Sequence, residues 1–276
     1  MGEGTTSPGG TVNVLAVAVT GRGLVDPHAP VFAADDEALL RGRAVFETTR
    51  VYGGRPFRLD AHVQRLARSA ARVRLETPDV HHCVELAQLV IDAAAIPDLA
   101  LRLFWTGRTL VATASALDPE VETQRGRGLR LAVVRWSTGA LAGAKSTSYA
   151  ENMAAQDEAI TRGADDALLV ADDDTILETP TANVWLRRGS TLLTPSLELP
   201  ILAGITRATV AELAPTAGFT IEEGRLPLDR IRVAEEVFIT SSIREVMPVA
   251  AVNETSFRLG PASRRLQQLL RQRATG

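Results

Sequence analysis

Short runs rich in apolar and β-branched residues alternate along the chain with longer amphipathic stretches, which indicates a protein with both strands and helices. In the first part of the chain, the predicted strands are residues 11–20, 44–52, 56–59, 101–106 and 110–116. The predicted helices are 60–74, which we expect Asp60 to cap, and 80–95, both with apolar residues at intervals of three and four. These elements predict a first α+β unit that ends near Leu117.

A stretch with proline, glycine and charged residues at 118–128 has the composition of a linker. Beyond it, the predicted strands are 129–136, 167–171, 175–178, 184–186, 191–193 and 236–240, and the predicted helices are 152–161 and 205–214. Because strands and helices do not alternate regularly, a Rossmann fold or a (β/α) barrel is disfavoured. We predict an α+β protein of two domains, 11–117 and 129–276, preceded by a flexible tail at 1–10.

A length of 276 residues, with 45% hydrophobic and 23% charged residues, is typical of a globular protein. The formal net charge of −3 leaves no basic field for a nucleic-acid backbone, so we expect small-molecule partners. No apolar run approaches the ~18 residues of a membrane helix, and the single cysteine, Cys83, cannot form an internal disulfide. We therefore expect a cytoplasmic protein that binds neither nucleic acid nor membrane.

The basic residues have an unusual distribution, because 29 of the 30 are arginine and only Lys145 is lysine. Codon bias explains arginine wherever a generic positive charge suffices. An amine, however, can lose its proton and act as a nucleophile, which a guanidinium does poorly. Lys145 is therefore a candidate for amine chemistry.

Several familiar catalytic motifs are absent from the sequence. It lacks GxGxxG after a strand, GxxxxGK[ST], GxSxG and HExxH, which disfavours dinucleotide, P-loop, esterase and zincin chemistry. His81 and His82 precede Cys83, but adjacent residues of a helix point about 100° apart. We predict no metal site.

Three elements in the second predicted domain carry complementary chemistry. Lys145 supplies an amine, Glu178 ends a predicted strand, and Gly204 ends a loop that opens a helix with Thr206 in its first turn. The free N–H groups at a helix start, together with a hydroxyl, suit a phosphate. An amine, a carboxylate and a phosphate site are the groups that pyridoxal 5′-phosphate (PLP) requires.

With these elements in this order, the chain resembles the fold-type IV PLP enzymes, the class IV aminotransferases. These include branched-chain aminotransferases, D-amino-acid transaminases, (R)-amine transaminases and 4-amino-4-deoxychorismate lyases. The resemblance extends from Val14 to Val252 and implies the two-domain fold of this class and PLP as cofactor. The matching segments are Val45-Phe46-Glu47, His62-Val63-Gln64-Arg65-Leu66, Lys145, Glu178 with Asn183, Thr194-Pro195, Gly204-Ile205-Thr206-Arg207, Ala234-Glu235-Glu236-Val237-Phe238 and Pro248-Val249.

The resemblance implies that Lys145 binds the cofactor as a Schiff base and moves the proton of the reacting carbon, while Glu178 pairs with the pyridine nitrogen. The other cofactor-binding residues that it implies are Arg65, Ile205, Thr206, Ser241 and Ser242 around the phosphate, and Tyr149 near the phenolic oxygen. From the residues alone, Arg65 could also be one more solvated arginine, and Tyr149 a core residue. Thr179-Pro180 stands where the family commonly has glycine, and Ala182 where it has serine. We expect cofactor binding to survive these two departures, which should change only the local shape of the backbone and one hydrogen bond.

Substrate choice in the family depends on the groups that receive the α-carboxylate. The chain lacks the Arg-x-His pair of typical D-amino-acid transaminases after strand 101–106, so Arg108, Arg41 and Arg43 are the candidates, with Phe46 as a further substrate-site residue. The resemblance implies a homodimeric transaminase that exchanges an amino group between a small amino acid, D more than L, and a 2-oxo acid, with (R)-amines as further substrates.

Three alternatives remain open at this point. One is 4-amino-4-deoxychorismate lyase, which eliminates pyruvate and gives 4-aminobenzoate. Another is a branched-chain L-amino-acid transaminase, and the third is a PLP-binding protein without catalysis.

Overall fold

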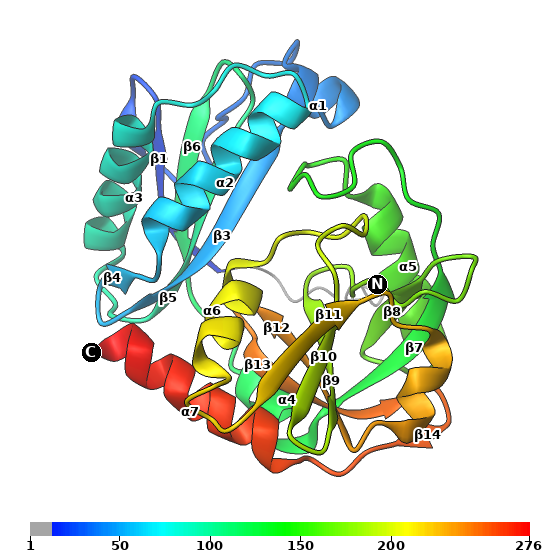
Figure 1. Cartoon of the computed structure of the whole chain (residues 1–276). Helices are drawn as coiled ribbons and strands as arrows, with labels where there is room; N and C mark the ends of the chain where they lie inside the picture. Colours follow the sequence, from blue (N-terminus) through cyan, green and yellow to red (C-terminus); the bar gives the residue numbers. More distant parts are fainter. Residues whose placement is uncertain (1–12) are drawn as a thin grey trace, which may run out of the picture.

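The computed structural model describes residues 13–276, which form two sheets with helices packed on them (Figure 1). The tail predicted at 1–10 lies outside the described residues. Within 13–276, no helix is both long and apolar enough to cross a membrane.

The first domain is a six-stranded antiparallel sheet in the order β2-β1-β6-β5-β3-β4. Its strands are β1 (Val14–Val19), β2 (Gly23–Val25), β3 (Val45–Tyr52), β4 (Arg55–Pro56), β5 (Leu99–Trp105) and β6 (Leu110–Ser115). Its helices are α1 (Glu37–Arg41), α2 (Leu59–Arg72) and α3 (Val80–Ala94), of which α2 and α3 cover one face of the sheet (Figure 1). Alternate residues of β5, beginning with Leu99, share a buried core with Leu66 of α2 and Leu86 of α3. The other face of β3 and β5 is thus available to the second domain.

Two local predictions for this domain are wrong. The strand predicted at 56–59 ends at Pro56, and α2 begins at Leu59. Arg58, not Asp60, is the N-cap, with a φ of 53° in the left-handed region, while Asp60 lies in the first turn. The left-handed residue ends the extended chain early because it turns the backbone directly into the helix.

The predicted linker 118–128 contains a helix, α4 (Glu120–Arg127). Its Arg125 donates a hydrogen bond of 2.6 Å to the carbonyl of Val246 in the second domain. The linker is therefore an ordered element that packs on the second sheet.

The second domain is a mixed eight-stranded sheet, in the order β11-β10-β9-β12-β13-β7-β8 with β14 beside β13. Its strands are β7 (Leu129–Arg135), β8 (Asp166–Val170), β9 (Asn183–Arg188), β10 (Thr191–Pro195), β11 (Thr220–Gly224), β12 (Glu236–Ser241), β13 (Glu245–Val252) and β14 (Thr255–Ser256). Its helices are α5 (Ala150–Thr161), α6 (Ile205–Leu213), the 3₁₀ helix η1 (Leu228–Val233) and α7 (Pro261–Thr275). Alternation along β12 sends Val237 and Ile239 into one buried cluster and Phe238 into another, beneath α6 and α7.

The segment predicted as a strand at 175–178 is not a regular strand, because Thr175 forms a bridge with Pro227 and only isolated contacts join the segment to β8. It nevertheless returns along β8. Ala171 N–H donates to the carbonyl of Thr175 at 2.9 Å, and Leu177 N–H donates to Leu169 at 3.0 Å. This return brings Glu178 to the edge of the second sheet, at the seam with the first domain.

Candidate active site

A cavity of about 1190 Å³ lies between the two domains. Strands β3 and β5 form one wall, where the register sets Phe46 opposite Phe104 and Thr48 opposite Arg102. The second domain contributes the loop before α5, the turn after Glu178, the start of α6 and the turn after β12. The cavity is lined by all of the predicted cofactor-binding residues, which are Arg65, Lys145, Tyr149, Glu178, Ile205, Thr206, Ser241 and Ser242.

The backbone of Lys145 is held by the first domain although the residue belongs to the second. Its carbonyl accepts a hydrogen bond from Phe46 N–H at 3.0 Å, and its own N–H donates to Ser69 Oγ of α2 at 3.1 Å. Ser146 forms a bridge with Val45 at the start of β3. The domain interface therefore fixes the direction in which the lysine enters the cavity.

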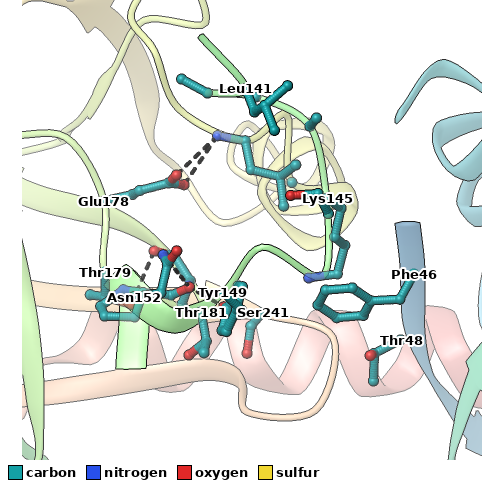
Figure 2. A pocket seen from close by; sticks show the side chains of 18 of the residues that line it. Phe46, Thr48, Leu141, Lys145, Tyr149, Asn152, Glu178, Thr179, Thr181 and Ser241 are labelled. Atoms are coloured by element: carbon teal, nitrogen blue, oxygen red, sulfur yellow. Dashed lines mark hydrogen bonds between the residues drawn. The ribbon is translucent and has the colours of Figure 1, made fainter. Parts of the chain in front are cut away.

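The Lys145 amine lies over the Phe46 ring, 4.4 Å from its centroid (Figure 2). Among the described residues, none forms an ion pair or hydrogen bond with Nζ. Burial lowers the pKa of Lys145 to about 8, against the opposing effect of Glu47. A minority of the amine is thus neutral near physiological pH, and this neutral form is the nucleophile.

Glu178 lies across the cavity from Lys145 and is half-buried in the cavity wall (Figure 2). Its carboxylate accepts hydrogen bonds from Leu202 N–H at 3.1 Å and from Asn183 Nδ2 at 3.1 Å. Burial raises the pKa of Glu178 to about 8, with Leu202 N–H acting in the opposite direction. Such a carboxyl group is a good partner for a protonated ring nitrogen, because pairing with that cation offsets the cost of burying the charge of the carboxylate.

A tight turn after Glu178 holds this geometry without the glycine and serine common in the family. Thr179 N–H donates to the carbonyl of Ala182 at 2.8 Å, and Thr179 Oγ1 accepts from Ala182 N–H at 3.0 Å. The Thr179 hydroxyl thus provides a side-chain contact within the turn, and Glu178 and Asn183 pair across its base.

The start of α6 has the features of an anion site. Gly204 is its N-cap and provides no side-chain hydrogen bond to the first turn, where Ile205 and Thr206 line the cavity. A Cβ on Gly204 would lie 2.0 Å from Oδ1 of Asn183, so only glycine fits beside this amide. The uncapped N–H groups and the Thr206 hydroxyl are the donor set that a phosphate requires.

Arg65 is not a solvated arginine, because it is buried at the seam between the domains. Its Nε and Nη2 donate to the two carboxylate oxygens of Glu47 at 2.6 and 2.8 Å, and its Nη1 donates to the carbonyl of Ala203 at 2.9 Å. Glu47 also contacts His62 Nδ1 at 2.7 Å. Burial acts to raise the pKa of Glu47, but Arg65 and His62 lower it to about 2. Glu47 therefore remains ionised and holds the guanidinium beside the start of α6.

Tyr149 lies in the cavity wall rather than in a domain core. Its ring packs edge-on against Phe46, with centroids 5.9 Å apart, and its hydroxyl donates to the carbonyl of Pro180. Burial raises the pKa of the hydroxyl, so it stays protonated at neutral pH.

The three arginines predicted to receive a substrate carboxylate lie in different places. Arg41 lines the cavity and pairs with Glu37 at 2.9 Å. Arg43 does not line it, since it pairs with Glu37 and donates to the Arg74 carbonyl at 2.7 Å. Arg108 also lies outside the cavity, exposed and 3.5 Å from Asp35.

The structure instead brings Arg102 into the cavity, a residue that the sequence reasoning missed. Its Nε donates to Thr48 Oγ1 at 3.3 Å, and within residues 13–276 no carboxylate pairs with it. Burial lowers its pKa. A signal was present in the sequence, because Ala100, Arg102 and Phe104 alternate with three leucines that face the core. Arg102 is thus a lone charge on an otherwise apolar strand face.

Comparison with known proteins gives a consistent result. Residues 44–252 match the family described as amino-transferase class IV. An aminodeoxychorismate lyase from Bacillus subtilis is 28% identical over 270 residues, 91% of this chain and 92% of that protein. A bifunctional aminodeoxychorismate lyase / D-amino acid transaminase from Mycobacterium tuberculosis is 30% identical over 246 residues, 80% of this chain and 85% of that protein. The PLP-bound structure of a hypothetical aminotransferase from Mycobacterium tuberculosis has a TM-score of 0.86 at 28% identity, covering 93% of this chain and 97% of that one.

The chain therefore belongs to the class IV aminotransferases. It is a PLP-dependent enzyme with the fold-type IV architecture. The family inferred from the motifs, the α+β fold of that class and PLP as cofactor are confirmed.

Proposed function

We propose that this enzyme is a transaminase that moves an amino group between an amino acid and a 2-oxo acid, with a preference for small D-amino acids and with (R)-amines as further substrates. PLP supplies the electron sink that makes the substrate's α-proton removable. Lys145 would bind the cofactor and carry that proton, which is supported by a half-buried, partly neutral amine that lies across the cavity from Glu178. Glu178 would hold the ring nitrogen protonated, and Arg65, Ile205, Thr206, Ser241 and Ser242 would hold the phosphate.

The single observation that carries the choice of an amino acid is the unpaired charge of Arg102 in this cavity. A substrate carboxylate would supply the missing partner, and buried arginine–carboxylate pairs are among the stronger polar contacts in proteins. Phe46 and Phe104, stacked at 5.9 Å beside it, suit a small apolar side chain.

A half-reaction spectrum tests the reaction class. The purified holoenzyme is mixed in turn with D-alanine, L-leucine, (R)-1-phenylethylamine and 4-amino-4-deoxychorismate, and the loss of the cofactor's visible absorbance is followed. Conversion by D-alanine without pyruvate elimination supports the proposal. Turnover of 4-amino-4-deoxychorismate to pyruvate and 4-aminobenzoate supports the lyase, which the Bacillus subtilis relative favours. Conversion by L-leucine alone supports the branched-chain alternative.

The role of Arg102 is tested by its replacement with glutamine. Arg102→Gln should raise KM for amino acids by about tenfold or more and leave (R)-amines, which lack a carboxylate, nearly unchanged. Arg108→Gln is the matched control, because this arginine is exposed and lies outside the cavity. An unchanged ratio of amino-acid to amine activity in Arg102→Gln would assign the carboxylate to other groups, with Arg41 next to be tested.

We also propose that the enzyme is a homodimer. Support comes from large apolar side chains exposed beside the cavity and on α1: Leu141 is 39% exposed, Met153 42%, Leu39 66% and Leu40 58%. Exposed apolar residues of this size are typical of interaction surfaces where they are contiguous. Analytical ultracentrifugation at micromolar concentration should give a mass near twice 29.5 kDa. A fully active monomer contradicts this proposal.

A further inference from the structure

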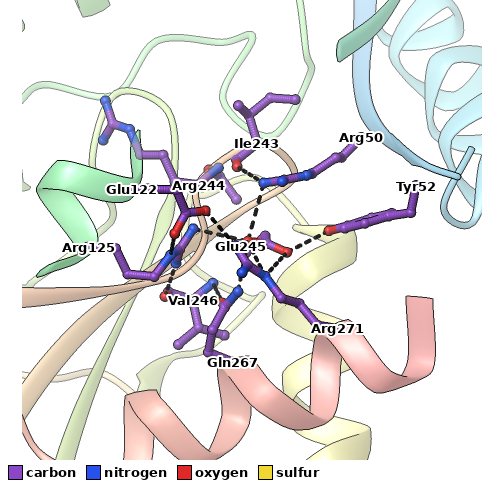
Figure 3. A network of polar contacts seen from close by, with 11 residues as sticks. Arg50, Tyr52, Glu122, Arg125, Ile243, Arg244, Glu245, Val246, Gln267 and Arg271 are labelled. Atoms are coloured by element: carbon purple, nitrogen blue, oxygen red, sulfur yellow. Dashed lines mark hydrogen bonds and ion pairs between the residues drawn. The ribbon is translucent and has the colours of Figure 1, made fainter. Parts of the chain in front are cut away.

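Glu245 is a fully buried carboxylate at the seam between the domains, directly after the turn 241–244 that lines the cavity (Figure 3). Its backbone has a φ of 56°, in the left-handed region that residues other than glycine rarely adopt. Its partners come from both domains and are Tyr52 Oη at 2.8 Å, Arg50 Nη1 at 3.3 Å, Arg125 Nη2 at 3.0 Å, Gln267 Nε2 at 2.7 Å and Arg271 Nη2 at 2.8 Å.

The three arginines around Glu245 are not equivalent. Arg125 and Arg271 share a second carboxylate, Glu122, at 3.2 and 2.5 Å. Within residues 13–276, Glu245 is the only carboxylate that pairs with Arg50, and Nε of Arg50 is buried there with no hydrogen-bond partner. A buried donor without a partner costs stability, so Arg50 is poorly explained as a purely stabilising residue.

Arg50 connects two walls of the active-site cavity. It lies on β3 two residues after Thr48 and four after Phe46, so the three side chains share one face of the strand. Its Nη1 donates to the carbonyl of Ile243 at 3.3 Å, within the turn that carries Ser241 and Ser242 (Figure 3).

The far side of the same turn is fixed independently. Arg244 Nη1 pairs with buried Asp166 at 2.6 Å, and Arg244 N–H donates to Ser241 Oγ at 3.3 Å. Arg50 therefore ties the Ile243 carbonyl of this turn to the first domain, Tyr52 ties Glu245 just after the turn to the same strand, and Asp166 ties the turn to β8.

We propose that Arg50 is a positioning residue for the cofactor phosphate. By holding the Ile243 carbonyl and the Glu245 carboxylate together, it keeps Ser241 and Ser242 at a set position relative to β3. The phosphate then meets hydroxyl groups that are already ordered, which removes an entropic cost of binding. The inference rests on the proposed placement of the phosphate at Ser241 and Ser242.

The test compares two ligands that differ only in the phosphate. Apo-protein is titrated with PLP and with pyridoxal, which lacks the phosphate, and the affinities of wild type and Arg50→Gln are measured. Arg50→Gln should weaken PLP binding about fivefold to tenfold, because the hydroxyl groups of the turn then have to be ordered when the phosphate binds. It should change the affinity for pyridoxal by less than about twofold, because pyridoxal does not use the turn.

Arg187→Gln is the matched control. Arg187 pairs with buried Glu236 at 3.2 Å and is 16% exposed, close to the 13% of Arg50, but within residues 13–276 none of its hydrogen bonds or ion pairs reaches the turn 241–244. Arg187→Gln should lower the thermal stability of the protein, as we also expect of Arg50→Gln, and should leave the affinities for PLP and for pyridoxal unchanged.

Three results would overturn the proposal. These are an equal loss of PLP and pyridoxal affinity in Arg50→Gln, no loss of either, or an equal PLP loss in Arg187→Gln. If Arg50→Gln does not fold, Arg50→Lys replaces it, since the ammonium keeps the charge but lacks the planar fork. It should give a smaller loss that is again confined to PLP, and a loss shared with pyridoxal overturns the proposal.

The measurement involves no amino-acid substrate, so it is independent of the proposed substrate preference. If wild type itself binds PLP no better than pyridoxal, the phosphate placement is wrong and the role of Arg50 falls with it. If PLP is favoured and Arg50→Gln is selective, the role of Arg50 stands whichever substrates are used.

Discussion

Replacing Gly204 with alanine would place a methyl group against the amide that supports Glu178. The backbone tolerates alanine here, because the φ of Gly204 is −68°. The new Cβ would lie 2.0 Å from Asn183 Oδ1, far closer than van der Waals contact, so the Asn183 side chain has to move. Asn183 Nδ2 donates to Glu178 at 3.1 Å and to the carbonyl of Leu202 at 2.9 Å, and both contacts are lost together.

In the apo-protein both contacts join Asn183 to neutral groups, because Glu178 keeps its proton up to a pKa of about 8. A hydrogen bond between neutral groups contributes about 0.5 to 1.5 kcal/mol. Gly204→Ala should therefore lower the free energy of unfolding of the apo-protein by about 1 to 3 kcal/mol. Loss of the hydrogen bond between Asn183 and Glu178 should also weaken cofactor binding, because the Glu178 carboxylate would then be less well ordered opposite the ring nitrogen. PLP affinity should fall about tenfold to hundredfold.

Titration of the apo-protein with PLP, followed by chemical denaturation, measures both effects. Gly224→Ala is the control, since a Cβ at Gly224 would have no atom within 4 Å and its φ is not in the left-handed region. Gly204→Ala in an Asn183→Ala background should cost little more than Asn183→Ala alone, because the clashing amide is gone. The reasoning is refuted if Gly204→Ala binds PLP within about twofold of Gly224→Ala, a difference of less than half a kcal/mol.

Three further outcomes are expected. Lys145→Ala should abolish turnover, because the chain has no other lysine to act as the amine. For the same reason, borohydride reduction of the wild type should attach the cofactor to Lys145 alone, and peptide mapping that finds the label elsewhere would contradict this prediction. Arg65→Ala should lower the free energy of unfolding by about 3 to 5 kcal/mol, since it leaves the Glu47 carboxylate buried without its cation; a loss below 1 kcal/mol in denaturation would argue against that pair. In the folded apo-protein, the pKa of Glu178 is about 8, whereas in the unfolded chain the carboxyl group loses its proton near pH 4.5. The contribution of the protonated Glu178 to stability is therefore complete below pH 4.5 and is lost as the pH rises through 8. The unfolding free energy of apo wild type should fall relative to Glu178→Gln over this interval, and a constant difference would show that the carboxyl is ionised when buried.

Local patterns predicted much of the framework because they depend on neighbouring residues. The strands β3, β5, β7 and β12 and the helices α2 and α3 follow from apolar periodicity and turn residues. The pattern did not predict β13 or α7, whose apolar residues pack on distant parts of the second domain. Their formation depends on partners that the local sequence does not reveal.

Residue chemistry also pointed to the site before any geometry was known. The single lysine, Glu178 and the loop ending at Gly204 pointed to the cofactor, and a resemblance that extends from Val14 to Val252 pointed to the family. These residues can be recognised in the sequence because few residue types supply an amine nucleophile or an uncapped helix start. Residue type and spacing therefore indicate the cofactor site without knowledge of the fold.

The choice among 29 arginines, in contrast, depended on tertiary structure. Arg108 and Arg43 were plausible from their neighbours in sequence, yet they lie outside the cavity, whereas Arg102 lies within it because of the register between β3 and β5. Arg50 and Glu245 are 195 positions apart and meet only when the two domains close. The sequence by itself indicated which cofactor the protein uses, because that depends on residue identity. The folded structure decided which charges surround the site, because that depends on contacts between segments far apart in the chain.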